Sequence, residues 1–172
     1  MSEADTPWSR LASRATRVAL TRKDMTYSSL VDALARDGVS VGERAIVSKI
    51  SRGTLRVSLF LQILAVTRVQ FPERWTEALR QTGTWEERAS GVFRAELDRQ
   101  PSIRLDDIAG RLSRLGPALS AASLDAQLRA GSLQLSVFIQ LIHILNSDSL
   151  DRFIDQADIV DAARSVLEID NA

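Results

Sequence analysis

The chain has no cysteine among its 172 residues. Disulfide bonds and thiolate metal sites are therefore excluded, and nothing points to an oxidising compartment. No apolar run approaches the roughly 20 residues that a membrane helix needs, so we expect no membrane partner. The first seven residues are polar and acidic and lack the apolar core of a signal peptide. A cytoplasmic location is the expectation that follows.

Residue sets that carry catalysis or hold metals are also missing. The single histidine, His143, falls on an apolar stretch, and one histidine without cysteine cannot build a zinc site. The acidic run from Asp148 to Asp161 does not have calcium-loop spacing. There is no phosphate-binding glycine loop and no nucleophile elbow. We therefore expect a protein that is not an enzyme and that uses no cofactor or metal.

Apolar residues make up 45% of the chain, which is enough for a substantial core. The net charge is zero, but the two halves differ. Residues 1–80 hold 13 Lys+Arg and 8 Asp+Glu, a net +5, whereas residues 81–172 hold 9 and 14, a net −5. Either the basic half meets a polyanion, or the two halves simply attract each other.

The sequence repeats itself at a spacing of 78 residues. Residues 25–38 align with 103–116 without a gap, and apolar positions coincide throughout. Further on, Gly53 aligns with Gly131, and a Leu-x-x-Ser-x-Phe-x-Gln pattern that begins at Leu55 returns at Leu133. The chain therefore contains two diverged copies of one domain.

Each copy reads as helices. In copy one, three- and four-residue apolar steps predict a first helix over about 8–22. A second helix starts after Thr26 as its N-cap and stops at Gly38. A third opens at Ser40 or Gly42 and ends at Gly53, where the left-handed conformation suits only glycine, and a fourth covers about 55–64. Pro72 then breaks the chain, and Trp75 is expected to pack back over the core.

The expected fold is all-α, with two tandem domains of four to five helices and a C-terminal helix. Copy one spans 8–80, copy two spans 85–154, and the joint lies at 81–85. The last helix, within 155–170, is predicted to have no counterpart in copy one. It would cap the pair of copies or serve dimerisation.

Copy one resembles the lambda-repressor-like helix-turn-helix family, of the Cro and xenobiotic-response type. The resemblance lies in residues 25–34, in Gly38-Val39-Ser40 and in residues 46–53, which end on the basic-glycine pair Arg52-Gly53. The copies are also similar to an uncharacterised bacterial domain family that shares this core. Compared with the family, the chain has about three more residues between Gly38 and Gly53, which lengthen the turn or extend the third helix.

The resemblance implies that the third helix enters the major groove of DNA. Its predicted inner face is apolar, with Ile46, Val47 and Ile50, and its outer face is basic. Arg44 and Ser48 lie where the family touches bases, and Arg56 lies where a phosphate contact is expected. The predicted DNA-binding residues are Tyr27, Arg44, Ser48, Lys49, Arg52 and Arg56.

Copy two lacks this basic face. Where copy one has Arg44, Ser48 and Arg52, copy two has Ala122, Ala126 and Ala130. We expect copy two to be a degenerate domain that pairs with copy one or serves dimerisation. A homodimer would place two third helices on successive major grooves, about 34 Å apart.

The function expected from the sequence is sequence-specific binding of double-stranded DNA, as a transcriptional regulator. The alternative is a non-enzymatic adaptor whose helical repeats bind protein partners, through copy two or the acidic C-terminal region.

Overall fold

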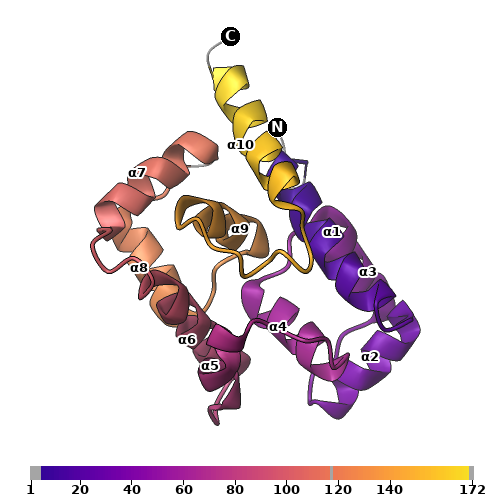
Figure 1. Ribbon diagram of the computed structural model, residues 1–172. Helices are drawn as coiled ribbons and strands as arrows, with labels where there is room; N and C mark the ends of the chain where they lie inside the picture. The colour runs from indigo at the N-terminus through magenta and orange to yellow at the C-terminus, as the bar shows by residue number, and fades with distance from the viewer. Residues whose placement is uncertain (1–4, 117, 171–172) are drawn as a thin grey trace.

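The computed structural model describes residues 5–116 and 118–170 and is helical throughout that part, with no strand in it (Figure 1). The all-α fold and the two tandem copies are thereby confirmed. The helices of copy one are α1 Pro7–Thr21, α2 Tyr27–Arg36, α3 Glu43–Arg52, α4 Val57–Val66, the 3-10 turn η1 Glu73–Trp75 and α5 Thr76–Arg80. Those of copy two are α6 Trp85–Leu97, α7 Leu105–Leu115, α8 Ala121–Ala130, α9 Leu135–Ile144 and α10 Gln156–Asp170.

The local signals that begin and end the helices act as the sequence predicts. The Thr26 side chain accepts a hydrogen bond from the Ser29 N–H and caps α2. Gly42 is the N-cap of α3, and Gly53 ends that helix with φ 64°. The six residues between α2 and α3 form a connection longer than the usual three to four. The extra residues of copy one therefore lengthen the turn, and α3 itself keeps ten residues.

The two copies exchange their first helices. Within copy one, α1 packs on α3, but its other main neighbour is α9 of copy two. Copy two mirrors this arrangement, because α6 packs on α8 and on α4 of copy one. Figure 1 shows α9 lying between α1 and α7, and α4 lying next to α5 and α6. Each copy thus completes its core with a helix from the other.

The backbones of the two copies meet where α4 and α9 begin. The Val57 N–H donates to the Leu133 carbonyl at 3.0 Å, and the Leu135 N–H donates to the Leu55 carbonyl at 2.9 Å. Between them, Arg56 and Gln134 form an isolated antiparallel bridge. These residues correspond to each other across the 78-residue repeat, so the bridge marks a pseudo-twofold axis between the copies.

Side chains around this axis also come in matched pairs. The Phe60 and Phe153 rings lie edge to face at 5.7 Å, and the equivalent Trp75 and Phe138 rings lie at 6.0 Å. Trp75 is fully buried, as predicted, but it covers the core against copy two.

The two first helices are anchored in the same way. The Trp8 indole N–H donates to the Leu115 carbonyl at 2.8 Å, and the Trp85 indole N–H donates to the Asp37 carboxylate at 3.1 Å. Leu115 and Asp37 are equivalent positions in the two copies, at the end of the second helix.

One side of the axis carries a buried polar network that the other side lacks. Glu96 is fully buried and accepts hydrogen bonds from the Trp75 indole at 2.6 Å and from the Ser147 hydroxyl at 2.7 Å. The Ser149 hydroxyl bonds to the same carboxylate, and Arg74 lies 3.6 Å from it. The first helices of the two copies align at a spacing of 77, as the pairs Trp8–Trp85 and Ser9–Glu86 show. The counterpart of Glu96 in copy one is therefore the buried Ala19, so the equivalent place there is apolar.

The prediction that the final helix has no counterpart is wrong for its beginning. By the 78-residue offset, α5 corresponds to the start of α10. The contacts agree, since α5 packs on α6 and α10 packs on α1. Only the later turns of α10 are without an equivalent in copy one, because the corresponding stretch of copy one, residues 81–84, forms the joint to α6.

Gly53 and Gly131 allow a close approach that no side chain permits. A Cβ on Gly53 would lie 1.8 Å from the Ser9 carbonyl oxygen, and one on Gly131 would lie 1.9 Å from that of Glu86. We expect Gly53→Ala to lower the free energy of unfolding by more than about 2 kcal/mol in urea titrations. The control is Gly110→Ala, on the exposed side of α7 with open space around it, which should raise stability by about 0.5–1 kcal/mol. Equal effects of the two changes would contradict the close-packing argument.

The helix exchange predicts that one copy alone is not a folded monomer. A fragment of residues 1–82 loses α9 as the neighbour of α1 and α6 as the neighbour of α4. We expect circular dichroism and light scattering to find it either unfolded or self-associated. Mixing it with a fragment of residues 83–172 should restore a helical one-to-one complex. A stable, helical monomer of residues 1–82 would show that the exchange is not required.

Candidate nucleic-acid interface

The outer face of α3 is formed as the sequence predicts. Ile46 and Ile50 are fully buried and fix the helix against α1 and α2. Arg44 and Arg52 are exposed, and Ser48 between them is partly exposed. The four-residue spacing of these three residues places them on one side of the helix, away from the core. Val47, which was expected to face inward, is only half-buried.

The other three predicted site residues lie elsewhere. Lys49 and Arg56 are exposed and line one hollow of 480 Å³ beside the start of α6. Tyr27 stands in the first turn of α2, half-buried, with its ring packed against the core. The structure thus gathers the predicted residues into the α3 face, the hollow next to it, and a separate tyrosine.

The basic side chains of this region have no ion-pair partner in the described part of the chain. Arg44, Lys49, Arg52 and Arg56 form no ion pair with any residue in 5–116 or 118–170. Glu86 of copy two lines the same hollow as Lys49 and Arg56 without pairing with either.

Other charges do join the two copies. Arg14 of α1 pairs with Asp158 of α10, and Arg74 pairs with Asp148 at 2.8 Å. Slight burial acts to raise the pKa of the Asp148 carboxyl, but the charges of Arg74 and Arg99 hold it below its usual value. Attraction between the halves therefore accounts for part of the charge asymmetry. The cations of the α3 region, like Arg17, Lys23 and Arg68 elsewhere in copy one, form no ion pair among the described residues.

The equivalent helix of copy two carries no such charge. Ala122, Ala126 and Ala130 are all exposed on α8, and Arg129 is tied to Asp125 at 2.9 Å. Copy two does pair with copy one, as expected, but through α6 and α9 and not through this alanine face.

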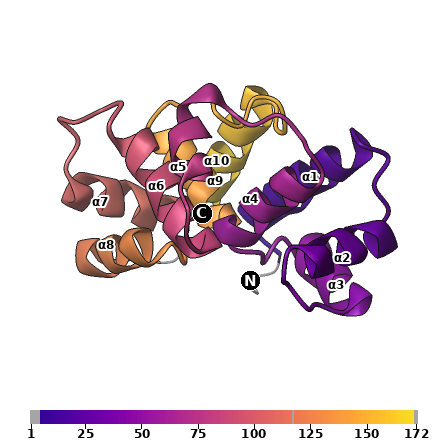
Figure 2. The same cartoon turned by 90° about the horizontal axis from the view of Figure 1, so that it is seen from below.

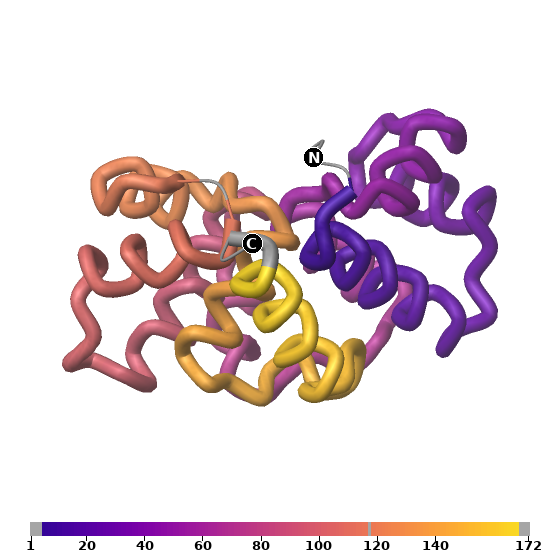
Figure 3. Tube along the Cα trace, turned by 90° about the horizontal axis from the view of Figure 1, so that it is seen from above, coloured from indigo at the N-terminus to yellow at the C-terminus, as the bar shows by residue number. Residues whose placement is uncertain are grey.

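The third helices of the two copies lie on the same side of the molecule and at its opposite ends (Figures 2 and 3). This arrangement follows from the pseudo-twofold axis between the copies. A single chain therefore already presents two third helices on the same side, one basic and one neutral.

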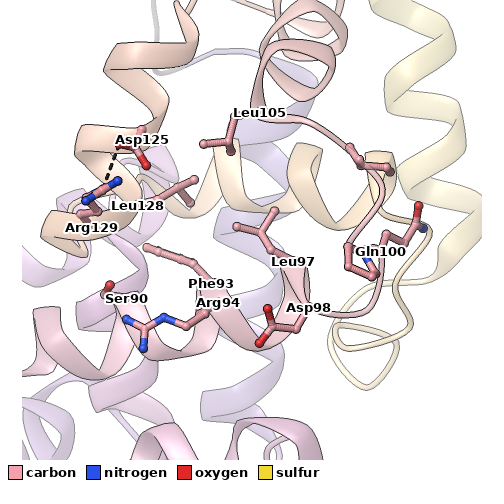
Figure 4. A pocket seen from close by; sticks show the side chains of 12 residues that line it. Ser90, Phe93, Arg94, Leu97, Asp98, Gln100, Leu105, Asp125, Leu128 and Arg129 are labelled. Atoms are coloured by element: carbon pink, nitrogen blue, oxygen red, sulfur yellow. Dashed lines mark hydrogen bonds and ion pairs between the residues drawn. The ribbon is translucent and has the colours of Figure 1, made fainter.

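A second hollow, of 540 Å³, lies in copy two between α6 and α8 (Figure 4). Phe93, Leu97 and Leu128 give it an apolar floor, and the Asp125–Arg129 pair stands at its rim. Its wall holds charges of both signs, so it has none of the basic character of the α3 region.

No pattern in the sequence indicates that α6 borders the α3 region. Trp85 and Glu86 begin copy two, yet they line the hollow that Lys49 and Arg56 share. The repeat spacing shows which residues correspond, but it does not show which copy a helix packs against. The paired Trp85 and Asp37, far apart in sequence, had no pattern from which their contact could be deduced.

His143 is half-buried on α9, with its ring 6.3 Å from that of Trp8. Burial lowers the pKa of its imidazole below the usual 6.5. In the part of the chain that the structure describes, no group of three His, Cys, Asp or Glu side chains could hold a metal ion. That part also contains no helix with the length and apolarity to cross a membrane.

One family model matches the chain, and it matches twice. It is described as a domain of unknown function (DUF6471) and covers residues 8–71 and again 85–150. The two matched stretches fall within the two copies of the repeat. No curated protein and no solved structure matches the chain.

The lowered pKa of His143 predicts a pH dependence of stability. Between the pKa of the folded protein and that of the unfolded chain, near 6.5, the unfolded chain binds more protons. The stability that depends on a neutral His143 is therefore complete above about pH 6.5 and is lost as the pH falls through this window. Urea titrations at pH 8 and pH 5.5 should show a larger loss of stability for the wild type than for His143→Gln. An equal loss in both would contradict the assignment.

Proposed function

We propose that this chain, which belongs to the DUF6471 family, binds double-stranded DNA in a sequence-specific manner and acts as a transcriptional regulator. The observation that carries the proposal is the outer face of α3. Its arginines are exposed and have no ion-pair partner among the described residues, while its opposite face is buried in the core. In the part of the chain that the structure describes, the second half leaves Arg44 and Arg52 exposed.

The chemistry of α3 suits the major groove. A helix in the groove needs one face for its domain and one for base edges and phosphates. Arg44 stands near the N-terminal end, and an arginine there can donate two hydrogen bonds to guanine. Arg52, two turns further on, suits a phosphate or a second base.

Because α8 carries no free cation, one chain has one basic third helix with which to recognise bases. On a duplex that lies along α3, the equivalent helix faces the same side of the molecule but offers no free cation. Base recognition is thus proposed for copy one alone, and copy two supports α1. A homodimer remains a separate proposal, in which two α3 helices would reach successive grooves.

The adaptor hypothesis rests on a different observation. The hollow in Figure 4 lies at the end of the molecule far from α3 and has an apolar floor. Its volume suits an apolar side chain or a small ligand. If it binds a protein partner, binding should not respond to nucleic acid. The unpaired arginines of α3 favour the DNA proposal over this one.

Binding to duplex DNA is expected to fall steeply with salt, because each phosphate contact releases counterions. Arg44→Ala should relax the base preference at one position, a loss of about 1–3 kcal/mol on the preferred sequence. Arg56→Ala should weaken binding to all sequences alike and reduce the salt slope by about one.

The matched control is Arg129→Ala on α8, which removes an exposed arginine from the equivalent helix of copy two. It should leave affinity and salt slope unchanged. A low-salt gel shift with random genomic fragments provides the first test. If no fragment is retarded, or if Arg129→Ala acts like Arg44→Ala, the proposal fails.

A further inference from the structure

The hollow that Lys49 and Arg56 share has features that the proposed base recognition does not use. It is formed by the connection from α3 to α4 on one side and by the start of α6 on the other. Its volume is 480 Å³, and Ser58, Trp85 and Glu86 also line it.

Ser58 is a buried polar residue without a partner. Only 4% of it is exposed, yet its hydroxyl makes no hydrogen bond to any residue that the structure describes. Thr16 donates to the Ala12 carbonyl and Thr67 to the Ile63 carbonyl, whereas the fully buried Ser13 hydroxyl of α1 likewise has no partner among the described residues. The Ser58 hydroxyl, unlike that of Ser13, is not shut off from solvent, so at the wall of the hollow it can donate a hydrogen bond to a ligand.

Ser58 also stands in the first turn of α4, a ten-residue helix. The Val57 N–H is used by the Leu133 carbonyl, but the N–H groups of Ser58 and Leu59 have no acceptor within the helix. The N-cap residue, Arg56, gives no side-chain cap. Ser58 and Leu59 both line the hollow, so their free backbone N–H groups and the positive end of the helix dipole point toward it.

The charges around the hollow favour an anion. Lys49 and Arg56 are cations without an ion-pair partner among the described residues, and Glu86 is the one acid in the lining. The nearby Asp37 carboxylate is already occupied, since it accepts from Gln62 at 2.6 Å and from the Trp85 indole.

The equivalent place in copy two lacks these features. Gln127 and Gln134 stand where copy one has Lys49 and Arg56. The counterpart of Ser58, Ser136, donates its hydroxyl to the Gln134 side chain at 3.4 Å. Copy two thus has the same helix start without free cations and with its serine bonded, so the fold alone does not account for the arrangement in copy one.

We propose that this hollow binds a phosphate oxyanion. The Ser58 hydroxyl and the first N–H groups of α4 donate hydrogen bonds to it, and Lys49 and Arg56 balance its charge. The phosphate belongs either to a duplex backbone or to a small phosphorylated molecule. In the first case the inference rests on the proposed function, and in the second it does not.

The test follows the backbone amides of the full-length protein by NMR while inorganic phosphate is added at constant ionic strength. We expect the Ser58 and Leu59 amides and the Trp85 indole N–H to shift together. The double variant Lys49→Gln, Arg56→Gln copies the residues of copy two and should weaken the response roughly tenfold. Glu86→Gln should strengthen it roughly two- to threefold, because it removes the acid from the wall. The substituted residues Lys49, Arg56 and Glu86 are all exposed, and unchanged amide signals in the rest of the protein would show that the variants keep the fold.

A parallel titration with a random duplex separates the two sources of phosphate. Shifts of the same amides that the double variant loses would identify backbone phosphate. A response to inorganic phosphate but not to duplex would identify a small molecule and would count against the proposed function alone. If neither probe shifts these amides, or if the double variant responds like the wild type, the inference is overturned, even where the duplex binds elsewhere.

Discussion

The exchange of first helices between the copies is the constraint on which the rest of the molecule depends. The α3 helix is held by α1, and α1 is held in turn by α9 of the other copy. The two backbone hydrogen bonds between residues 55–57 and 133–135 fix the copies to each other at the axis. The surface proposed to meet DNA is therefore built by copy one but kept in place by copy two. A change in the α1–α9 contact would alter α3 without touching a single basic residue.

Much of this fold could be predicted from the sequence. The 78-residue spacing predicts the two copies. The Thr26 cap and the helix-ending Gly53 and Gly131 are local signals, and each acts in the structure as its chemistry requires. The exchange could not be predicted, because an apolar face is equally satisfied by either copy. Trp75 illustrates this limit: its burial was predictable, but its contact with Phe138 of copy two was not. The same holds for the site, where the α3 face was predictable and the wall that α6 adds was not.

Divergence between the copies has left the axis intact and changed what surrounds it. Matched pairs such as Phe60–Phe153 and Trp75–Phe138 keep the packing of the two sides alike. On the surface, the exposed arginines of α3 correspond, by the repeat, to exposed alanines of α8. The α8 helix packs on α6 and α7 through its buried face, with Leu124 and Leu128, and this packing requires no charge on its outer face.

The buried network around Glu96 gives a physical reason for the two unlike copies to pair with each other. If copy one paired with another copy one, Ala19 would take the place of Glu96, and the buried Trp75 indole would lose its acceptor. If copy two paired with another copy two, Phe153 would take the place of Trp75, and Glu96 would be buried without that donor. Each like pair leaves a buried polar group less satisfied, at a cost of about 1–3 kcal/mol or more where the group is charged. Helix exchange carries a risk of domain swapping between chains, and this one-sided network favours the pairing of copy one with copy two, which a single chain can complete by itself.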